Sequence, residues 1–226
     1  MALTMPTKHG RHQQNMRIHA APPPAPAHVP EPGPEPVDEK DVVQRLCLEL
    51  NEAGYTAEIS RGQVVVSPRT RRESSNIVDR LSDILYPLKL ANGWRFHQTW
   101  GVHIPPFPDF RLPDLMVAPD DAEQFDDMSV KGHSALLVAE VCSPGTRSVD
   151  WEEKPLDYAR AGVPLYLIVD PLAETRTVVL LSDPLPDLTP DDDRDPYRQI
   201  LMVEEGELVE LPEPFGIKLD TGTLFG

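Results

Sequence analysis

The architecture of this chain is indicated most clearly by two segments, Arg-Leu-Pro-Asp-Leu-Met-Val at residues 111–117 and Ala-Leu-Leu-Val-Ala-Glu-Val at residues 135–141. The second segment is apolar almost throughout, which is typical of a strand in the interior of a sheet. Each segment carries a single acid, Asp114 near the start of the first and Glu140 near the end of the second. Burying an unpaired carboxylate is costly, so both acids require an explanation.

A metal site would explain the two acids if their strands are neighbours. Adjacent antiparallel strands could set Asp114 and Glu140 side by side, and a cation would then relieve their mutual repulsion. Mg²⁺ suits this role, with Mn²⁺ as the alternative, because these ions prefer hard oxygen ligands and retain water for chemistry. The competing interpretation is that each acid is solvated or caps a loop, as single acids at strand ends usually do.

The flanking sequence predicts an α/β fold. Apolar residues at helical spacing predict one helix over 42–50, a second that begins at Ser74 or Ser75 and ends at Gly93, and a third over 150–161. Loops are expected at the acidic stretch 120–127 and the stretch 183–196, which is rich in Pro and Asp. Strands are expected at 55–59, 63–66, 94–103, 112–117, 135–141, 165–169, 177–181, 197–203 and 207–211. This order implies a mixed central sheet flanked by helices, with hairpins formed by the first two and the last two strands.

Residues 1–37 differ in composition from the rest of the chain. The stretch 20–37 consists mainly of Pro, Ala and Glu, a composition that cannot bury a core and favours extended conformations. We therefore expect a disordered tail over residues 1–37 and a single folded domain over residues 38–226. A domain of this length can bury a substantial hydrophobic core.

The charge of the chain weighs against a nucleic-acid partner without excluding one. The net charge is −16, whereas most nucleic-acid binders present a basic face to the phosphates. A phosphate-containing substrate would have to approach through bound cations or a local basic path. Arg69, Arg71 and Arg72 form the one cationic cluster near the predicted site and are candidates for that path, although short arginine runs in loops are more often merely solvated.

The sequence also indicates where the protein works. Its longest apolar runs are far shorter than a membrane-spanning helix, and no apolar leader opens the chain. The two cysteines, Cys47 and Cys142, are too few for a disulfide framework and lack the spacing of a metal site. We therefore expect a cytoplasmic protein without membrane contact.

The residues that follow the second acidic strand carry an ordered set of motifs. Residues 143–154 read Ser-Pro-Gly-Thr-Arg-Ser-Val-Asp-Trp-Glu-Glu-Lys, and residues 158–171 read Tyr-Ala-Arg-Ala-Gly-Val-Pro-Leu-Tyr-Leu-Ile-Val-Asp-Pro. Together with the Pro-Asp and Glu-Val strands, this order resembles the Uma-two family, over residues 38–225 and most strongly over 112–171. The resemblance implies a restriction-endonuclease-like core of the PD-(D/E)xK superfamily. It also implies a metal-dependent endonuclease that hydrolyses phosphodiester bonds, with DNA as the expected substrate.

The resemblance assigns roles to particular residues. It implies that Asp114 and Glu140 are metal ligands. In the usual superfamily pattern a lysine stands two residues after the glutamate, but this position is Cys142 here, which cannot act as a fixed cation. The family pattern places its lysine on the following helix, so Lys154 is the expected third catalytic residue.

Two further residues could support Lys154. Asp150 and Tyr158 lie four residues on either side of it, so all three could share one helical face. Asp150 could hold the ammonium, and Tyr158 could orient a phosphate or a water. The competing interpretation is a surface salt bridge beside a half-buried tyrosine. Pro155 allows a helix that begins near Glu152 but not one that begins at Asp150, which would weaken the partnership of Asp150 with Lys154.

A second function remains open at this point. The chain could be a catalytically silent domain that uses the nuclease fold to bind another protein. The missing strand lysine, Pro155 within the helix and the acidic surface favour this alternative. A homodimer would suit cleavage of both DNA strands, but the sequence pattern reveals no interface.

Overall fold

The structure is a computed structural model that describes residues 39–67 and 71–226, apart from the side chains of residues 39–41. The predicted tail over residues 1–37 lies outside the described residues and stays a prediction. Arg69 also lies outside them. Among the helices of the described ranges, none is long and apolar enough to cross a bilayer. The cytoplasmic location stays a prediction.

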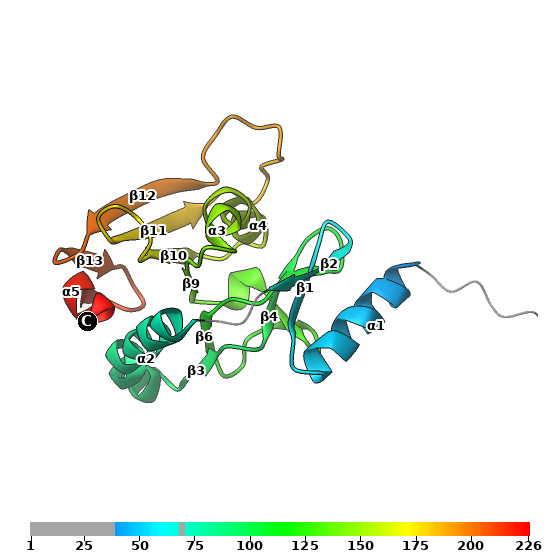
Figure 1. Ribbon diagram of the computed structural model, residues 1–226, viewed down its shortest axis with the longest axis horizontal. Helices are drawn as coiled ribbons and strands as arrows, with labels where there is room; N and C mark the ends of the chain where they lie inside the picture. The colour runs from blue at the N-terminus through cyan, green and yellow to red at the C-terminus, as the bar shows by residue number, and fades with distance from the viewer. Residues whose placement is uncertain (1–38, 68–70) are drawn as a thin grey trace, which may run out of the picture. The chain divides into compact units, whose positions relative to one another are not determined.

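A mixed six-stranded sheet, the central sheet, organises the described part of the chain (Figure 1). Its strand order is β12-β11-β10-β9-β6-β3; β9 and β10 are parallel, and the other neighbours are antiparallel. This sheet confirms the predicted α/β fold with a mixed central sheet. Its strands are β3 (Trp94–His97), β6 (Leu115–Pro119), β9 (Leu137–Val141), β10 (Leu165–Asp170), β11 (Thr177–Pro184) and β12 (Tyr197–Glu204).

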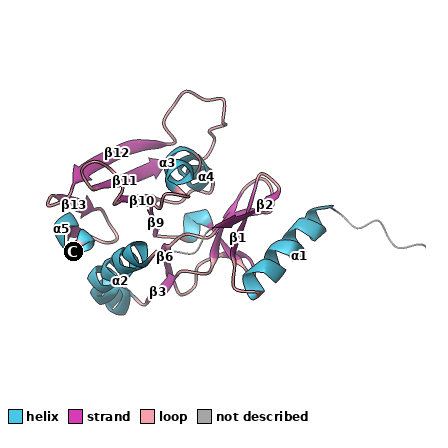
Figure 2. Ribbon diagram, in the orientation of Figure 1, coloured by secondary structure: helices cyan, strands magenta, loops and turns pink. Residues whose placement is uncertain are grey.

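Both faces of the central sheet are covered (Figure 2). Along β9, Leu137 and Val141 point into one core and Val138 into the other, because successive side chains of a strand alternate between faces. The first core is closed by α2 (Arg72–Asn92), β13 (Leu208–Leu211), β14 (Ile217–Asp220) and α5 (Thr221–Phe225). The second core is closed by α3 (Arg147–Glu152), α4 (Lys154–Arg160) and strands of another sheet.

That other sheet, the N-terminal sheet, was not predicted as a sheet. Among described strands its order is β2-β1-β5-β4-β8-β7, and α1 (Glu39–Glu52) packs on it through Cys47. The predicted hairpin of its first two strands is confirmed, with Arg61 and Gly62 both at positive φ in the turn. The strands are β1 (Thr56–Ser60), β2 (Gln63–Ser67), β4 (Gly101–Ile104), β5 (Asp109–Arg111), β7 (Gln124–Asp126) and β8 (Ser129–Lys131).

Two predictions in this region are wrong. The single strand predicted over 94–103 is two strands, because the chain leaves the central sheet after His97 and enters the N-terminal sheet at Gly101. The stretch 120–127 is only partly a loop, since β7 pairs with β8. The Asp126 carboxylate accepts hydrogen bonds from the Met128 amide and the Ser129 hydroxyl. This acid was predicted to lie in a loop, but it stabilises the turn between β7 and β8.

The predicted final hairpin is also wrong. β12 pairs with β11 across a long connection, and β13 pairs with β14, a strand that was not predicted. The C-terminal hairpin therefore exists, but one strand further along the chain. Its turn is closed by backbone bonds from Phe215 and Gly216 to the Pro212 carbonyl.

Two helix boundaries differ from the prediction. The N-terminal cap of α2 is Arg71, not Ser74 or Ser75 as predicted. The Ser75 amide already donates to the Arg71 carbonyl, so the helix begins before Ser75, and Ser74 is buried within its first turn. The helix predicted over 150–161 is two short helices that meet at Glu153. Pro155 lies in the first turn of α4, where its missing amide hydrogen costs no helical bond.

Candidate active site

The two predicted acids lie on adjacent antiparallel strands and on the same face of the central sheet. The pairing of Leu115 with Ala139 places Asp114, just before β6, opposite Glu140 on β9. Side chains alternate along both strands, so the two carboxylates share the face that carries Met116 and Val138. Oδ2 of Asp114 accepts a hydrogen bond of 2.7 Å from the Val141 amide, which fixes that carboxylate against β9.

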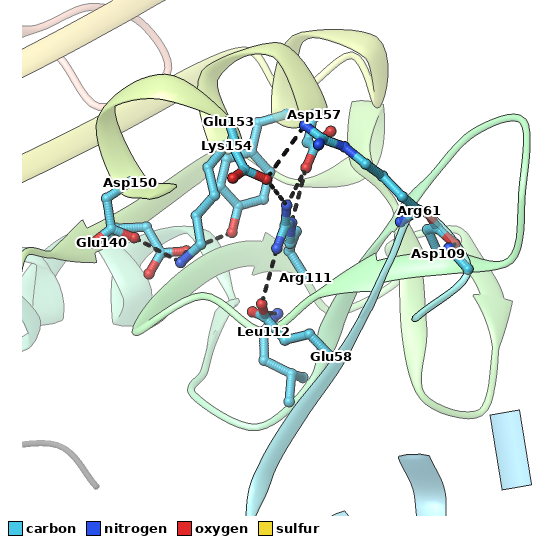
Figure 3. Close-up of polar contacts among 12 residues, drawn as sticks. Glu58, Arg61, Asp109, Arg111, Leu112, Glu140, Asp150, Glu153, Lys154 and Asp157 are labelled. Atoms are coloured by element: carbon cyan, nitrogen blue, oxygen red, sulfur yellow. Dashed lines mark hydrogen bonds and ion pairs between the residues drawn. The ribbon is translucent and has the colours of Figure 1, made fainter. Parts of the chain in front are cut away.

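The short helix α4 covers this face and brings two side chains to Glu140 (Figure 3). Nζ of Lys154 lies 2.8 Å from Oε1 of Glu140. The Tyr158 hydroxyl donates to the same oxygen at 2.6 Å. Lys154 and Tyr158 are one helical turn apart, so both point down from the helix onto the sheet. Tyr158 is fully buried, and the predicted alternative of a half-buried tyrosine is therefore wrong.

Asp150 completes what we call the Lys154 cluster, which consists of Lys154, Glu140 and Asp150. Oδ1 of Asp150 lies 2.8 Å from Nζ of Lys154, and the side chain is only 1% exposed. The partnership survives the break at Glu153 because the two residues remain one turn apart. The predicted alternative of a surface salt bridge is therefore wrong for this pair as well.

Burial and neighbouring charges set the protonation of the cluster. Burial raises the pKa of Glu140 to about 8, although the adjacent Lys154 ammonium lowers it. Burial raises the pKa of Asp114 as well, against the bond from the Val141 amide. Burial lowers the pKa of Lys154, but Glu140 and other buried acids raise it by more, so it lies above its ordinary value. The site thus combines a permanent cation, Lys154, with two carboxylates whose pKa values are raised, Asp114 and Glu140.

Cys142 occupies the strand position at which the superfamily pattern has its lysine. It is buried, its amide donates to the Val169 carbonyl, and burial raises the pKa of its thiol. A neutral thiol supplies no positive charge. The ammonium at this site comes from Lys154 on α4 instead, the position that the resemblance implied.

Glu58 and Arg111 are buried charged residues that the sequence analysis did not single out. They face each other across β1 and β5, because Ile59 pairs with Phe110. Oε1 of Glu58 accepts a bond of 2.7 Å from the Leu112 amide, and Oε2 lies 3.3 Å from Nη1 of Arg111. Glu58 therefore holds the segment that leads into Asp114. The available signal was an acid inside an apolar strand, the same signal that marked the two predicted acids.

Arg111 is the centre of a second group of charges, the Arg111 cluster, which consists of Arg111, Glu58, Glu153 and Asp157. Its guanidinium donates to Asp157 from Nε at 2.9 Å and from Nη2 at 2.6 Å, and Glu153 lies 3.6 Å away. Burial lowers the pKa of Arg111, but the acids around it raise the value above the ordinary one. This cluster ties α4 to the N-terminal sheet beside the Lys154 cluster (Figure 3).

The aspartate of the Val-Asp-Pro motif has an anchoring position. Oδ2 of Asp170 accepts bonds from Nε of Arg147 at 2.7 Å and Nε1 of Trp151 at 3.1 Å, both on α3. Its Oδ1 accepts from the Leu172 amide. Because α3 carries Asp150, this fully buried carboxylate fixes the helix that presents the third member of the Lys154 cluster.

The arginines proposed to contact nucleic acid are only partly described. Arg71 and Arg72 are exposed at the start of α2, and neither forms an ion pair with another described residue. The helix packs through Ile77 on the sheet face opposite Glu140. A role for these arginines stays a prediction.

The oxygen atoms at the site fit a hard divalent cation that keeps part of its water shell. Oδ2 of Asp150 is buried and accepts no hydrogen bond from the described part of the chain, whereas Oδ1 contacts the Lys154 ammonium. Oε1 of Glu140 has two partners, which leaves Oε2 as an open donor atom. Within the described ranges, no three His, Cys, Asp or Glu side chains form a ready metal-binding group. Asp114 and Glu140 would therefore supply two ligands and water the rest, an arrangement that Mg²⁺ accepts.

A cavity of about 630 Å³ lies on the other side of the Arg111 cluster. Glu153 and Asp157 line it together with Arg61, Arg160 and apolar residues of α1 and the β4–β5 loop. Neither Asp114 nor Glu140 lines this cavity. The cavity is therefore not the site of the two acids, of which Asp114 is partly exposed and Glu140 is buried.

Comparisons with known proteins identify the class of fold first. The structure resembles a crystal structure from Anabaena variabilis ATCC 29413, described as a putative nuclease belonging to DUF820, with a TM-score of 0.53 and 16% identity over 75% of this chain and 89% of that chain. At this identity the likeness concerns the fold, which is nuclease-like. The Uma2 family model, described as "Putative restriction endonuclease", matches residues 42–221. The chain therefore belongs to the Uma2 family, the Uma-two family of the sequence resemblance. No match to a curated protein was found.

Proposed function

We propose that the chain is a metal-dependent endonuclease that hydrolyses phosphodiester bonds of DNA, with Mg²⁺ or Mn²⁺ as its cofactor. The observation that carries this proposal is the convergence of three predicted residues on one sheet face. Asp114 and Glu140 lie opposite each other, and Nζ of Lys154 lies 2.8 Å from Glu140. Membership of a family described as restriction endonucleases supports the same reaction class.

The residues of the site divide the work between them. Asp114 and Glu140 would hold the cation, which when bound supplies a Lewis acid and an activated water. The Tyr158 hydroxyl orients Glu140 by donating to Oε1, so that Oε2 remains available. The raised pKa of Lys154 keeps its ammonium protonated near neutral pH. Lys154 therefore cannot act as a general base, and its contribution is to stabilise negative charge that develops on the phosphoryl oxygens.

Arg71 and Arg72 are candidates for steering the substrate. Both are exposed, and the domain is otherwise strongly acidic, so each would supply a phosphate contact that is rare on this surface. Replacing both with alanine should weaken DNA binding and reduce the dependence of affinity on salt. An unchanged salt dependence would remove these two residues from the DNA path.

The decisive experiment combines a cleavage assay with metal calorimetry. The full chain is incubated with supercoiled plasmid, linear DNA and RNA in Mg²⁺, Mn²⁺ or EDTA. Asp114→Asn should abolish cleavage and cation binding but leave the fold intact, because the substituted side chain still accepts the Val141 amide bond. The matched control is Asp120→Asn, which removes an exposed acid paired with Arg95. Cleavage retained in Asp114→Asn would refute the proposal.

A second function is favoured by one specific observation. Lys154 is held between two buried carboxylates and is itself only 6% exposed, so the cluster resembles a closed structural ion group. This favours a catalytically silent domain that binds a partner protein. Calorimetry separates the two functions, because a silent domain would bind neither Mg²⁺ nor Mn²⁺ in the wild type or in Asp114→Asn.

A further inference from the structure

The edge strand β12 presents large apolar side chains to solvent. It is the outermost strand of the central sheet on this side (Figure 1). Ile200, Leu201 and Met202 are 49%, 42% and 57% exposed. Because neighbouring residues of a strand point to opposite faces, apolar side chains are exposed on both faces of the sheet along β12. Natural edge strands are usually blunted by charges, prolines or bulges. The register of β12 against β11 is nevertheless continuous from Gln199 to Glu204, and it is interrupted only at Arg198, opposite Asp183 with its positive φ.

The outer backbone groups of β12 can be assigned from its pairing. The Glu205 amide donates to the Arg176 carbonyl, which continues the ladder with β11 through odd-numbered residues. The amides and carbonyls of even-numbered residues therefore point away from β11. At Glu204 these groups are already used, since the amide donates to the Glu207 carboxylate and the carbonyl accepts from the Thr221 hydroxyl.

The outward groups that remain belong to Arg198, Ile200 and Met202, and their arrangement is self-complementary. In an antiparallel pairing with Ile200 opposite Ile200, Arg198 lies opposite Met202 on each side of a two-fold axis. Each of these pairs exchanges two backbone bonds, so the pairing uses the outward groups of all three residues. It also sets Arg198 diagonally across from Glu204 of the second copy, within reach of a long side chain, although Arg198 has an exposed ion pair of 2.9 Å with Asp183 of its own chain to exchange or share.

We propose that β12 is a homodimer interface, in which a second copy of this chain pairs antiparallel with the edge strand about a two-fold axis at Ile200. The central sheet then runs continuously through both copies. Arg198 lies near one end of the strand and Glu204 lies at the other. A two-fold axis brings these unlike charges together, so they favour a second copy over an unrelated strand. The interface lies outside the cluster formed around Glu140, so this inference is independent of the catalytic proposal.

The first test measures the mass of the full chain in solution. Sedimentation velocity from about 1 to 100 μM should show a concentration-dependent dimer, as expected for an interface of modest area. Ile200→Lys and Met202→Lys should each weaken dimerisation at least about tenfold, because like charges then face each other or replace apolar contact. The matched control is Leu90→Lys, on α2 and 66% exposed, which should leave the dimer unchanged.

The second test fixes the register. Ile200→Cys should form an intermolecular disulfide under mild oxidation, because residues of a hydrogen-bonded pair have Cα atoms about 5.5 Å apart, within the disulfide range. The native thiols of Cys47 and Cys142 are buried and should not compete. A wild type that is monomeric throughout, or an Ile200→Lys variant that dimerises as well as the wild type, would overturn the proposal. Stronger crosslinking at Leu201→Cys would overturn the stated register.

Discussion

The Lys154 cluster and the Arg111 cluster are both built around a buried cation, but they differ in how completely they are satisfied. Arg111 donates directional bonds to Asp157 and Glu58, and Glu58 also accepts the Leu112 amide. In the Lys154 cluster, Oδ1 of Asp150 contacts only the Lys154 ammonium, and the buried Oδ2 has no hydrogen-bond partner among the described residues. Buried polar groups in folded proteins are nearly always paired.

The difference separates a structural cluster from a functional one. A fully bonded ion cluster holds elements in place, and the Arg111 cluster joins α4 to the N-terminal sheet. An incompletely bonded one stores unfavourable energy that a ligand can relieve, and strongly shifted pKa values are concentrated at such sites. Burial raises the pKa of Glu140 to about 8. The Lys154 cluster is therefore the better candidate for cation and substrate binding.

The largest expected effect is the loss of stability when Arg111 is replaced. Arg111→Met leaves the buried Glu58 carboxylate with the Leu112 amide but without its charged partner, and breaking such an ion pair costs about 3–5 kcal/mol. Lys154→Met should cost less, because Glu140 can become neutral by taking up a proton. The loss of cleavage should follow the opposite order. Lys154→Met should lose cleavage completely, and Arg111→Met should lose less of it. Urea denaturation and plasmid cleavage measure the two responses.

The control for both substitutions is Arg95→Met, which breaks an exposed pair with Asp120. Exposed pairs contribute about 0–1 kcal/mol, so this variant should be close to the wild type. Equal destabilisation by Arg111→Met and Lys154→Met, with equal loss of cleavage, would erase the distinction between the two clusters.

The next effect is the dependence of stability on pH in the metal-free protein. In the unfolded chain Glu140 titrates near its ordinary pKa of 4.5, but in the folded domain it retains its proton to a pKa of about 8. The folded state therefore binds more protons than the unfolded state between these values. The stabilisation from this group is complete below pH 4.5 and is lost as the pH rises toward 8. We expect a loss of about 2–4 kcal/mol from this group.

The measurement is chemical denaturation in EDTA at a series of pH values between 5 and 8. Histidines with lowered pKa values, such as His97, oppose the trend, so the comparison is with Glu140→Gln, in which the slope due to Glu140 is absent. Identical pH slopes in the two proteins would show that the carboxylate does not titrate in this range. Added Mg²⁺ should flatten the wild-type slope, because a bound cation favours the ionised carboxylate.

The central sheet and most of the Lys154 cluster could be predicted because their signals are local. An acid within an apolar strand is visible in a few residues, and the four-residue spacing of Asp150, Lys154 and Tyr158 survives the break between α3 and α4. The alternation of side chains then sets both acids on one face once their strands are adjacent.

The N-terminal sheet and the Arg111 cluster could not be predicted because they depend on distant pairing. Strands of three residues, such as β5 and β7, are too short to show a period of two. Glu58 and Arg111 are 53 residues apart, and only the pairing of β1 with β5 brings them together. The acid within the β1 segment is a local signal for Glu58 alone, and nothing in either local sequence shows that Arg111 is its partner.

A smaller effect is expected when the charge of Glu58 is removed. In Glu58→Gln the side-chain oxygen still accepts the Leu112 amide, but the ion pair with Arg111 is lost. Hydrogen bonds to charged groups contribute about 1.5–3 kcal/mol, and we expect a loss in the lower part of that range. Because Glu58 holds the segment before Asp114, turnover should fall while the affinity for Mg²⁺ stays near the wild type. Calorimetry and cleavage kinetics separate these outcomes, and a loss of Mg²⁺ binding would place Glu58 among the ligands.

The smallest effect on stability, and the sharpest test of the comparison, is expected at Asp150. Asp150→Asn weakens the ion pair between Oδ1 and Lys154 but breaks no bond at Oδ2, and this cost is offset because a negative charge that raises the pKa of Glu140 is removed. It should therefore change the free energy of unfolding by less than about 1 kcal/mol. Asp157→Asn in the Arg111 cluster removes the charge from the oxygen that accepts from both Nη2 and Nε of Arg111, and should cost about 1.5–3 kcal/mol.

Activity should reverse this order. Without the Asp150 carboxylate, Lys154 is held by Glu140 alone, and a displaced ammonium lowers the rate of cleavage about 10–100-fold. Asp157→Asn changes a residue that lies further from Asp114 and Glu140. It should therefore lower the rate of cleavage less than Asp150→Asn does, although it costs more stability. If Asp150→Asn proved as destabilising as Asp157→Asn and cleaved DNA at the wild-type rate, the unpartnered Oδ2 of Asp150 would be a packing defect. The Lys154 cluster would then have the same structural role as the Arg111 cluster.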